Sequence, residues 1–421
     1  MAATKKGQVV PDTATPFKWN TAYARRAQGM RASEIRELLK LLDQPGILSF
    51  AGGIPDPALF PTTAIAAACA AILADPAQGA AALQYSVSEG YKPLREWIAG
   101  DMGRMGVPCG IENIVVTGGS QQGLDFLGKL LLTEGDTALV TAPTYLGALQ
   151  AFAPYEPRYD TLDLDGNMTP TAHAEAARAT GGRVAFAYAV PDFANPTGET
   201  MDEAARLRLL DLADGLGVPL IEDAAYSAIR FAGAPLPSCL ALDVRRRGHI
   251  DRTRTVYCGT FSKTISPGLR VGWICAAQDL VGKVVLAKQA ADLHSPSLNQ
   301  MVIHRVASAE YDTVVPKVVA LYRARRDAML AALGAHMPPG VRWTRPDGGM
   351  FVWVTLPEGM DGADLLRRAL DEEQVAFVPG AAFFADGSGR NTLRLSYSRQ
   401  PEPAIAEGMS RLGRLVARTS G

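Results

Sequence analysis

One lysine of this sequence stands among residues that could hold a phosphorylated aldehyde. Lys263 lies in the segment GTFSKTISPGLRVGW. The hydroxyls of Thr260 and Ser262 and the guanidinium of Arg270 are donors suited to one phosphate group. A lysine beside such an anion site is placed to form an imine with an aldehyde cofactor. For this segment alone, a solvated surface lysine is the simpler alternative.

A glycine-rich turn in TGGSQQGLDFL could supply further phosphate donors. Gly118 and Gly119 precede Ser120 and Gln121 at the predicted start of a helix. The first N–H groups of a helix have no intrahelical partner, and the helix dipole favours an anion there. Tight packing without a ligand is the alternative for this turn. The segment does not fit the G-x-x-x-x-G-K-[ST] pattern of nucleotide-binding loops, which argues against an ATPase.

Polar side chains also follow two predicted strands. Asp223 and Tyr226 come after the apolar run VPLI, and Asn195 lies in PDFANPTG after AFAYAV. Open α/β sheets bind ligands at the carboxyl ends of their strands. A buried carboxylate there requires a cationic partner, and a protonated pyridine nitrogen would be one. A helix N-cap or a surface turn for Asp223 and a simple turn for Asn195 are the alternatives.

An α/β chain must position these residues. From about residue 112, apolar β-rich runs alternate with helical stretches, as in NIVVTGG followed by SQQGLDFLGKLLL. This alternation predicts a mostly parallel central sheet flanked by helices, and the C-terminal part predicts a smaller α+β domain. We expect an N-terminal arm with part of the small domain at 1–60, a large cofactor-binding domain at 61–300 and a small C-terminal domain at 301–421.

Composition and charge exclude several classes of protein. The 421 residues carry a net charge of -1, which provides no field for nucleic acid, and the short basic run 245–247 is expected to be a solvated loop. Five widely spaced cysteines indicate neither a disulfide framework nor a metal site. No window approaches the roughly 20 apolar residues of a membrane helix, and no signal peptide is evident. We therefore expect a cytoplasmic protein with no membrane contact.

Together the segments resemble, in order and spacing over nearly the whole chain, the fold-type I pyridoxal-phosphate-dependent aminotransferases of class I/II. The chain is similar to the 2-aminoadipate and kynurenine aminotransferase branch through SEIRELLKLL, GILSFAGGIPDPALFP, LQYSVSEGYKPLR, GGMFVWV and NTLRLSYS. The resemblance implies pyridoxal 5′-phosphate as cofactor and a homodimer with shared active sites. It also implies an L-amino acid donor, with 2-aminoadipate, aromatic and branched-chain amino acids as candidates, and 2-oxoglutarate as acceptor.

The resemblance further implies a role for each site residue. Lys263 would carry the cofactor as a Schiff base, Asp223 would pair with the pyridine nitrogen, and Asn195 with Tyr226 would contact the ring O3′. The other implied cofactor contacts are Ser120, Gln121, Tyr145, Thr260, Ser262, Arg270 and, from the other subunit, Tyr85. The implied substrate contacts are Arg394 for the α-carboxylate, Gly53, Tyr85, Asn195 and, for a distal carboxylate, Arg36.

Two other functions stay open at the level of the sequence. A PLP-dependent lyase or decarboxylase would share Lys263, Asp223 and Arg394 with a transaminase. A ligand-sensing module is also possible, because aminotransferase-like domains occur fused to DNA-binding domains. The chain shows no helix-turn-helix extension and no basic face, which argues against the sensing module.

Overall fold

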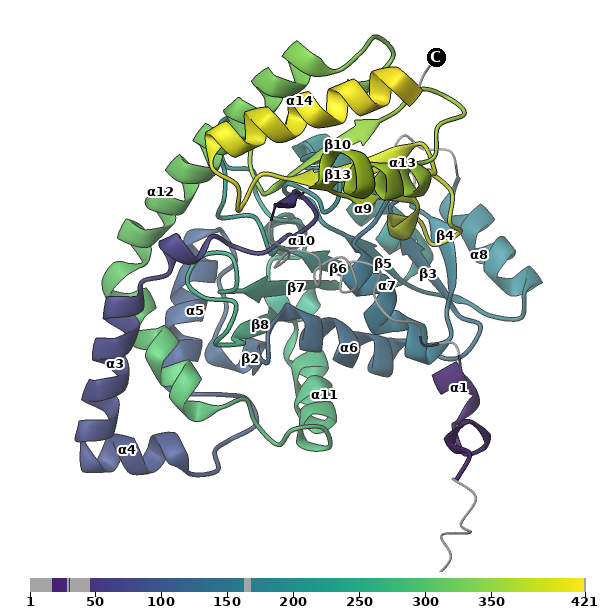
Figure 1. Ribbon diagram of the computed structural model, residues 1–421. Helices are drawn as coiled ribbons and strands as arrows, with labels where there is room; N and C mark the ends of the chain where they lie inside the picture. The colour runs from purple at the N-terminus through teal and green to yellow at the C-terminus, as the bar shows by residue number, and fades with distance from the viewer. Residues whose placement is uncertain (1–16, 29, 31–45, 163–167, 420–421) are drawn as a thin grey trace, which may run out of the picture.

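A seven-stranded sheet forms the centre of the computed structural model, which describes residues 17–28, 30, 46–162 and 168–419 (Figure 1). The strand order is β2-β8-β7-β6-β5-β3-β4, and β8 runs antiparallel to its neighbours while the remaining pairs are parallel. The prediction of a mostly parallel sheet is confirmed. The strands are β2 (Ile114–Thr117), β3 (Thr137–Val140), β4 (Arg158–Thr161), β5 (Val184–Ala189), β6 (Leu220–Asp223), β7 (Thr255–Thr260) and β8 (Gly272–Cys275).

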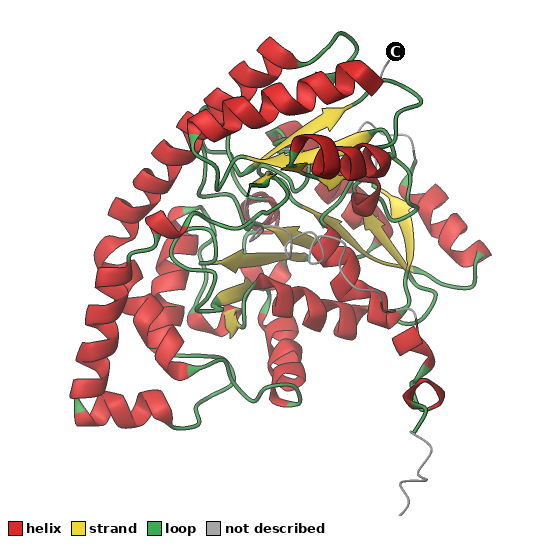
Figure 2. Cartoon of the chain, viewed as in Figure 1, coloured by secondary structure: helices red, strands yellow, loops and turns green. Residues whose placement is uncertain are grey.

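Helices cover both faces of this sheet (Figure 2). Alternate residues of β7 belong to different core clusters, since Val256 and Cys258 pack with α6 and α11 while Tyr257 packs with α5 and α10. Because both faces are buried, the inner strands are mostly apolar, as the sequence predicted, whereas the edge strand β4, with the sequence RYDT, is partly exposed. The helices are α5 (Lys92–Arg104), α6 (Ser120–Leu131), α7 (Leu146–Phe152), α8 (Pro170–Ala179), α9 (Glu203–Leu216), α10 (Cys239–Arg247) and α11 (Gln278–Gln289).

Local sequence signals account for several helix ends. Helix α9 begins after Asp202, whose side chain accepts the N–H of Ala205, and ends at Gly217 with a φ of 71°. Helix α6 begins directly after Gly119, whose φ of 88° turns the chain sharply from β2 into the helix. The first turn of α6 is thereby placed at the carboxyl edge of the sheet.

A smaller antiparallel sheet lies beside the central one, with the order β12-β13-β10-β9. Its strands are β9 (Arg342–Trp343), β10 (Phe351–Thr355), β12 (Val378–Pro379) and β13 (Thr392–Ser396), while β1 (Leu48–Ser49) pairs in parallel with β11 (Val375–Ala376). The other helices are α1 (Arg25–Gln28), α3 (Thr62–Ala74), α4 (Pro76–Leu83), α12 (Ser297–His336), α13 (Gly362–Arg368) and α14 (Glu402–Thr419).

Helix α12 connects the two parts of the molecule. It packs against α3, α4 and α5 along one stretch and against α14 along another, and Figure 1 shows it running along one whole side. The predicted limit between domains at residue 300 falls inside this helix. Because this helix crosses residue 300 without a break, it does not mark a domain boundary there, and the three domain ranges remain predictions.

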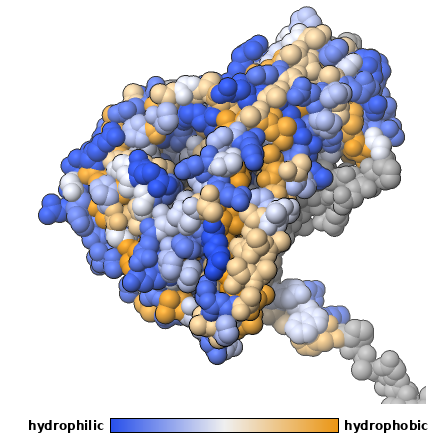
Figure 3. Space-filling model, turned by 90° about the vertical axis from the view of Figure 1, so that its left-hand side faces the viewer, coloured by the Kyte–Doolittle hydropathy of each residue, from blue (hydrophilic) through white to orange (hydrophobic). Residues whose placement is uncertain are grey.

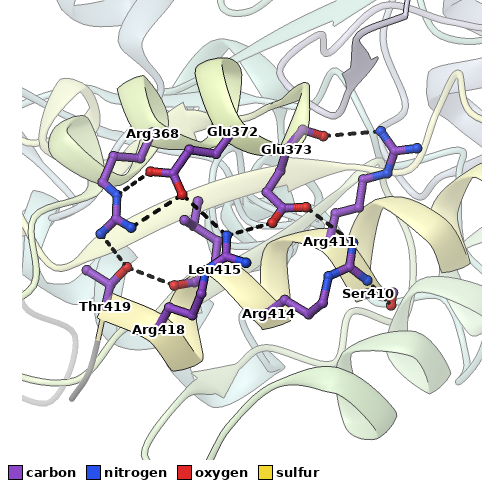
Figure 4. A network of polar contacts seen from close by, with 9 residues as sticks. All are labelled: Arg368, Glu372, Glu373, Ser410, Arg411, Arg414, Leu415, Arg418 and Thr419. Carbon is purple, nitrogen blue, oxygen red and sulfur yellow. Dashed lines mark hydrogen bonds and ion pairs between the residues drawn. The ribbon is translucent and has the colours of Figure 1, made fainter.

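Arginines of α14 fasten this helix to a π-helical turn, Ala369–Glu373 (Figure 4). The carboxylate of Glu373 accepts from Arg414 at 3.2 Å and from Arg418 at 2.7 Å, and Glu372 pairs with Arg368 at 2.8 Å. These arginine side chains are 41 to 53% exposed, so each pair should contribute only about 0 to 1 kcal/mol. The apolar face of α14 supplies most of its attachment.

The basic run 245–247 is the last turn of α10, which corrects the expectation of a loop. Arg246 pairs with Asp211 at 2.8 Å, and Arg247 pairs with Asp214 and Asp243. Cations are favoured at the negative end of the helix dipole, and this explains a helical arginine run.

The helices give the following result for membrane spans. Within the described ranges, no single helix has the length and apolar character to cross a membrane. Helices α3 and α4 meet at a bend of 104°, and they reach the length and apolar composition of a membrane span only when both are counted together.

Candidate active site

A cavity of about 140 Å³ opens at the carboxyl ends of β5, β6 and β7, beside the first turn of α6. This is the edge at which open α/β sheets bind ligands. A larger cavity of about 460 Å³ shares Ala225 and Thr260 with it but is lined by neither Lys263 nor Asp223. The residues that line the smaller cavity are Ser120, Gln121, Tyr145, Val190, Asn195, Asp223, Ala225, Tyr226, Thr260, Ser262, Lys263, Pro267 and Arg270.

Lys263 follows β7 and projects into this cavity. Its Nζ donates to the carbonyl oxygen of Gly53 at 3.0 Å and lies 5.8 Å from the ring centre of Tyr226. Burial lowers the pKa of the Lys263 amine to about 8, and the nearby positive charges of Arg394 and Arg270 act in the same direction. A substantial fraction of the amine is therefore neutral near pH 8, as a nucleophile or a proton acceptor requires.

Asp223 ends β6 and is buried with one oxygen unpaired. Its Oδ2 accepts a hydrogen bond of 2.9 Å from the phenol of Tyr188, whereas Oδ1 has no partner in the described part of the chain. Burial raises the pKa of the Asp223 carboxyl to about 6, against the hydrogen bonds from the Tyr188 phenol and the Ala225 backbone, which lower it. Asp223 is buried at the end of β6 and is not the cap residue of any described helix, so neither the helix N-cap nor the surface turn holds for it. The open oxygen is suited to a cationic ligand group.

The sequence interpretation missed Tyr188, which it treated only as part of a strand. Tyr188 lies in β5, is fully buried and points its hydroxyl at the neighbouring strand β6. A buried tyrosine usually finds a partner for its hydroxyl, so the isolated polar group in the run VAFAYA was the available signal.

Arg394 is 1% exposed in β13 and is held by backbone and side-chain acceptors. Its Nη1 donates to Oδ1 of Asn195 and its Nη2 to the carbonyl of Ala51, each at 2.8 Å. The guanidinium stacks at 4.2 Å from the ring centre of Phe351 and 4.9 Å from that of Phe383. Its Nε is buried without a partner in the described ranges, and burial lowers the Arg394 pKa to about 10. The Arg394 guanidinium is therefore a positive charge in a fixed orientation, and its Nε–H is still able to donate a hydrogen bond.

Asn195 joins this arginine to the cavity. Its Oδ1 accepts from Arg394, and its Nδ2 lies 3.4 Å from the hydroxyl oxygen of Tyr226. Burial raises the pKa of Tyr226, so this phenol stays protonated and can donate. Asn195 is thus more than a turn residue, as its place after β5 suggested.

The glycine turn before α6 packs against Arg270. The Arg270 Nη2 donates to the carbonyl of Gly118 at 3.0 Å. A Cβ at Gly119 would lie 2.4 Å from the same nitrogen, and a Cβ at Gly272 would lie 2.7 Å from the backbone nitrogen of Ser120. Glycine at 119 therefore lets the guanidinium approach the start of the helix, and glycine at 272 lets β8 lie against the backbone of the same turn.

Hydroxyl and aromatic groups complete the lining. Thr260 Oγ1 donates to Ser262 Oγ at 2.9 Å. The hydroxyl of Tyr145 donates to Oε1 of Gln121 at 3.3 Å, and Nε2 of Gln121 donates to the carbonyl of Gly147 at 2.6 Å. The side chain of Gln121 thus connects the start of α6 with the segment that holds Tyr145.

Among the predicted site residues that the structure describes, Arg394, Gly53 and Tyr85 do not line this cavity, although Arg394 contacts Asn195 and Gly53 contacts Lys263. Tyr85 is 78% exposed, does not line the cavity, and places its ring 6.0 Å from that of His294. Its predicted role is in the other subunit, which a single chain does not test. Arg36 lies outside the described residues.

The fold and the cavity together define a class: a fold-type I enzyme that uses pyridoxal phosphate (PLP). Comparisons with known proteins agree. Residues 55–412 match the family described as Aminotransferase class I and II. The chain belongs to this family and is a PLP-dependent aminotransferase that acts on amino acids and 2-oxo acids.

Three similar proteins illustrate the match. A 2-aminoadipate transaminase of Thermus thermophilus is 46% identical over 401 residues, which cover 95% of this chain and 98% of the relative. Aromatic-amino-acid aminotransferase 1 of Thermococcus litoralis is 41% identical over 403 residues, with 94% of each chain covered. The crystal structure of Thermus thermophilus LysN, an α-aminoadipate aminotransferase complexed with N-(5′-phosphopyridoxyl)-L-leucine, has a TM-score of 0.85 at 44% identity and covers 96% of this chain and 99% of that one.

These findings confirm the resemblance and the cofactor, and they favour transamination over the lyase and sensor alternatives. The residues present fit PLP. The open oxygen of Asp223 suits a protonated ring nitrogen, and Ser120, Ser262 and Arg270 line the same cavity with donors that suit a phosphate. No cluster of three or more metal-ligating side chains is found among the described residues.

Proposed function

We propose that Lys263, Asp223, Tyr226 and Asn195 are the catalytic groups of this aminotransferase. The observation that carries the proposal is the unpaired oxygen of buried Asp223 in the same small cavity as the amine of Lys263. The remaining cofactor contacts would come from the lining residues Ser120, Gln121, Tyr145, Thr260, Ser262 and Arg270.

Bound here, PLP supplies an aldehyde for covalent attachment of amines and a protonated ring that withdraws electrons from the substrate. Asp223 would keep the ring nitrogen protonated, because an ion pair favours the charged form. Tyr226 and Asn195, 3.4 Å apart, would donate to the ring oxygen. Lys263 Nζ, with its pKa lowered to about 8, would remove the proton from the substrate Cα and return a proton in the next step.

Arg394 would bind the α-carboxylate of both substrates. Its guanidinium is already fixed by Asn195 and the carbonyl of Ala51, so little side-chain entropy is lost when a carboxylate binds. Because both half-reactions of a transaminase use a substrate with this group, one arginine serves the donor and the acceptor.

The central test is chemical labelling of the cofactor lysine. Borohydride reduction of the holoenzyme should fix the cofactor on one peptide, the one containing Lys263. Lys263→Ala should abolish turnover while the phosphate contacts still hold PLP non-covalently, and Lys283→Ala, at an exposed position of α11, is the control. A label on any other lysine would overturn the assignment.

For substrates, we propose 2-oxoglutarate as acceptor and 2-aminoadipate, aromatic or branched-chain amino acids as donors. The names of the relatives and the leucine adduct of the LysN structure support this range. A panel of amino acids mixed with enzyme and 2-oxoglutarate, followed by glutamate formation, tests it. Keto acid formation without glutamate would instead indicate elimination.

Arg36 is the proposed contact for a distal carboxylate. Arg36→Ala should raise the KM for 2-oxoglutarate and 2-aminoadipate and leave that for leucine nearly unchanged. Equal losses for both classes would assign Arg36 to folding, and no loss would make it a surface residue.

We propose a homodimer with shared active sites. Tyr85 lies among exposed apolar residues of α4 and the following segment, namely Leu83, Tyr85 and Val87 at 75, 78 and 57% exposure. Figure 3 shows apolar residues gathered in a band on the side of the molecule that carries α3 and α4. Exposed apolar area of this kind marks an interaction surface. Mixing Lys263→Ala with Tyr85→Ala subunits should restore partial activity in hybrid dimers, and a fully active monomer in sedimentation would refute the dimer.

For location, we propose the cytoplasm. All five cysteines are free, which agrees with a reducing compartment. Cell fractionation with activity assays is the test, and activity recovered mainly outside the cytoplasm would refute it.

A further inference from the structure

A fully buried lysine lies behind the glycine turn. Lys288 of α11 is 0% exposed, and its Nζ donates to both oxygens of Asp292 at 3.0 and 2.9 Å and to Ser295 Oγ at 2.9 Å. It also lies 3.3 Å from Oε1 of Gln122, in the first turn of α6. Burying an ammonium group is costly unless its hydrogen bonds are satisfied, and here they all are.

The amide of Gln122 connects this lysine to the turn. Its Oε1 accepts the backbone N–H of Gly118 at 2.7 Å, and its Nε2 donates to Oδ2 of Asp292 at 2.8 Å. An ammonium group can only donate and a carboxylate can only accept, so Lys288 and Asp292 together determine which end of the amide faces Gly118. A flipped amide would place its NH₂ group against two donors.

Gly118 is consequently held from two sides. Its N–H is bound by Gln122, and its carbonyl is bound by Arg270 at 3.0 Å. The two peptide groups on either side of Gly118 are therefore both held, and they lead directly into Ser120, where the unpaired N–H groups of α6 begin. The orientation of those donors therefore depends on a side chain that does not line the cavity itself.

We infer that Lys288, acting through Gln122, is a positioning residue for the cofactor phosphate. The inference rests on the proposed phosphate site at Ser120 and Arg270. Without the ammonium group, Oε1 of Gln122 loses one of its two donors and Asp292 loses its ion pair, so the amide holds the Gly118 N–H less firmly and the turn loses its fixed geometry. Only the phosphate end of the cofactor senses this change.

The experiment compares the affinities of PLP and of pyridoxal, which lacks the phosphate, for the full-length chain. Lys288→Met should weaken PLP binding about tenfold, the size expected for the loss of a hydrogen-bonded contact, and should leave pyridoxal binding unchanged. Turnover at saturating PLP should stay near wild type. Lys283→Met, at an exposed site on the same helix, is the matched control and should change neither affinity.

Gln122→Met is the second variant, because it removes the connecting amide and keeps Lys288 paired with Asp292. It should reproduce the selective loss of PLP affinity, and the double variant should be no weaker than either single one. Equal weakening of PLP and pyridoxal, or no weakening, would overturn the inference. If Ser120→Ala and Arg270→Ala also leave PLP affinity unchanged, the proposed phosphate site itself fails.

Discussion

The phenol of Tyr188 donates to Asp223 at 2.9 Å, and the second oxygen of that carboxylate faces the cavity residues without a partner in the described ranges. One oxygen is therefore fixed by the sheet, and the other is available to a ligand. Burial raises the pKa of this carboxyl to about 6, so the carboxylate is ionised at a cost that a cationic ligand would remove.

Substitution of Asp223 and substitution of Tyr188 should both reduce activity, but to different extents. Asp223→Ala should lower turnover by a few powers of ten, because removing one member of a buried charge pair costs about 3 to 5 kcal/mol. Tyr188→Phe should lower kcat/KM only about tenfold and move the acidic limb of its pH profile upward, since the hydrogen bond from Tyr188 lowers the Asp223 pKa. Near wild-type turnover of Asp223→Ala would make this residue structural.

The raised pKa of Asp223 also predicts a pH-dependent stability of the cofactor-free protein. The folded-state pKa of about 6 lies above the ordinary 3.8, so the native state binds more protons between these values and its stability falls as pH rises through this window. Asp223→Asn should therefore stabilise the cofactor-free protein by on the order of 3 kcal/mol at pH 8 and hardly at all below pH 4. Urea unfolding at both pH values measures this, and an equal effect at both would contradict it.

Covalent capture of the cofactor should depend on pH through Lys263. The neutral amine is the nucleophile, and the pKa of this group is lowered to about 8. The capture rate should rise about tenfold per pH unit below this value and level off above it. Stopped-flow mixing of cofactor-free protein with PLP follows the reaction. A midpoint near the ordinary 10.5 would show that burial does not act on this amine.

Arg394→Lys should be nearly as damaging as Arg394→Ala. A lysine cannot bind Asn195 and the Ala51 carbonyl and still present a planar pair of donors to a carboxylate. We expect kcat/KM for donor and acceptor to fall at least about 100-fold in both variants, with cofactor content unchanged. If kcat/KM fell for one substrate only, the α-carboxylate of the unaffected substrate would have to bind elsewhere.

Two glycines with different surroundings give a paired prediction. Gly272→Ala should weaken PLP binding, because its Cβ would meet the Ser120 backbone nitrogen at 2.7 Å and displace the start of α6. Gly282→Ala, where a Cβ meets nothing within 4 Å, should keep PLP affinity and raise the unfolding free energy by up to about 1 kcal/mol. Cofactor titration and thermal unfolding of both variants distinguish the local effect from a general one.

The sequence by itself determined the α/β class, the cofactor and most of the cavity residues. Each has a local signal: Lys263 stands among hydroxyls, Gly118 and Gly119 precede a helix, and Asp223 and Asn195 follow apolar strands. The carboxyl ends of parallel strands lie at the same edge of a sheet. The positions of these residues after successive strands therefore already implied that they lie close together.

Only the tertiary structure decided which side chains support them. Three hydrogen bonds join residues that lie far apart in the sequence. Tyr188 and Asp223 are 35 positions apart, Asn195 and Arg394 are 199 apart, and Gln122 and Lys288 are 166 apart. No local pattern marks such pairs, because each depends on strand register and on how helices pack across the sheet. The same reason explains the basic run 245–247, whose place at a helix end depends on acidic partners on α9 and within α10. The ends of strands can be recognised from the residue types around them. Long-range contacts cannot, because they form only when the helices and strands have packed together.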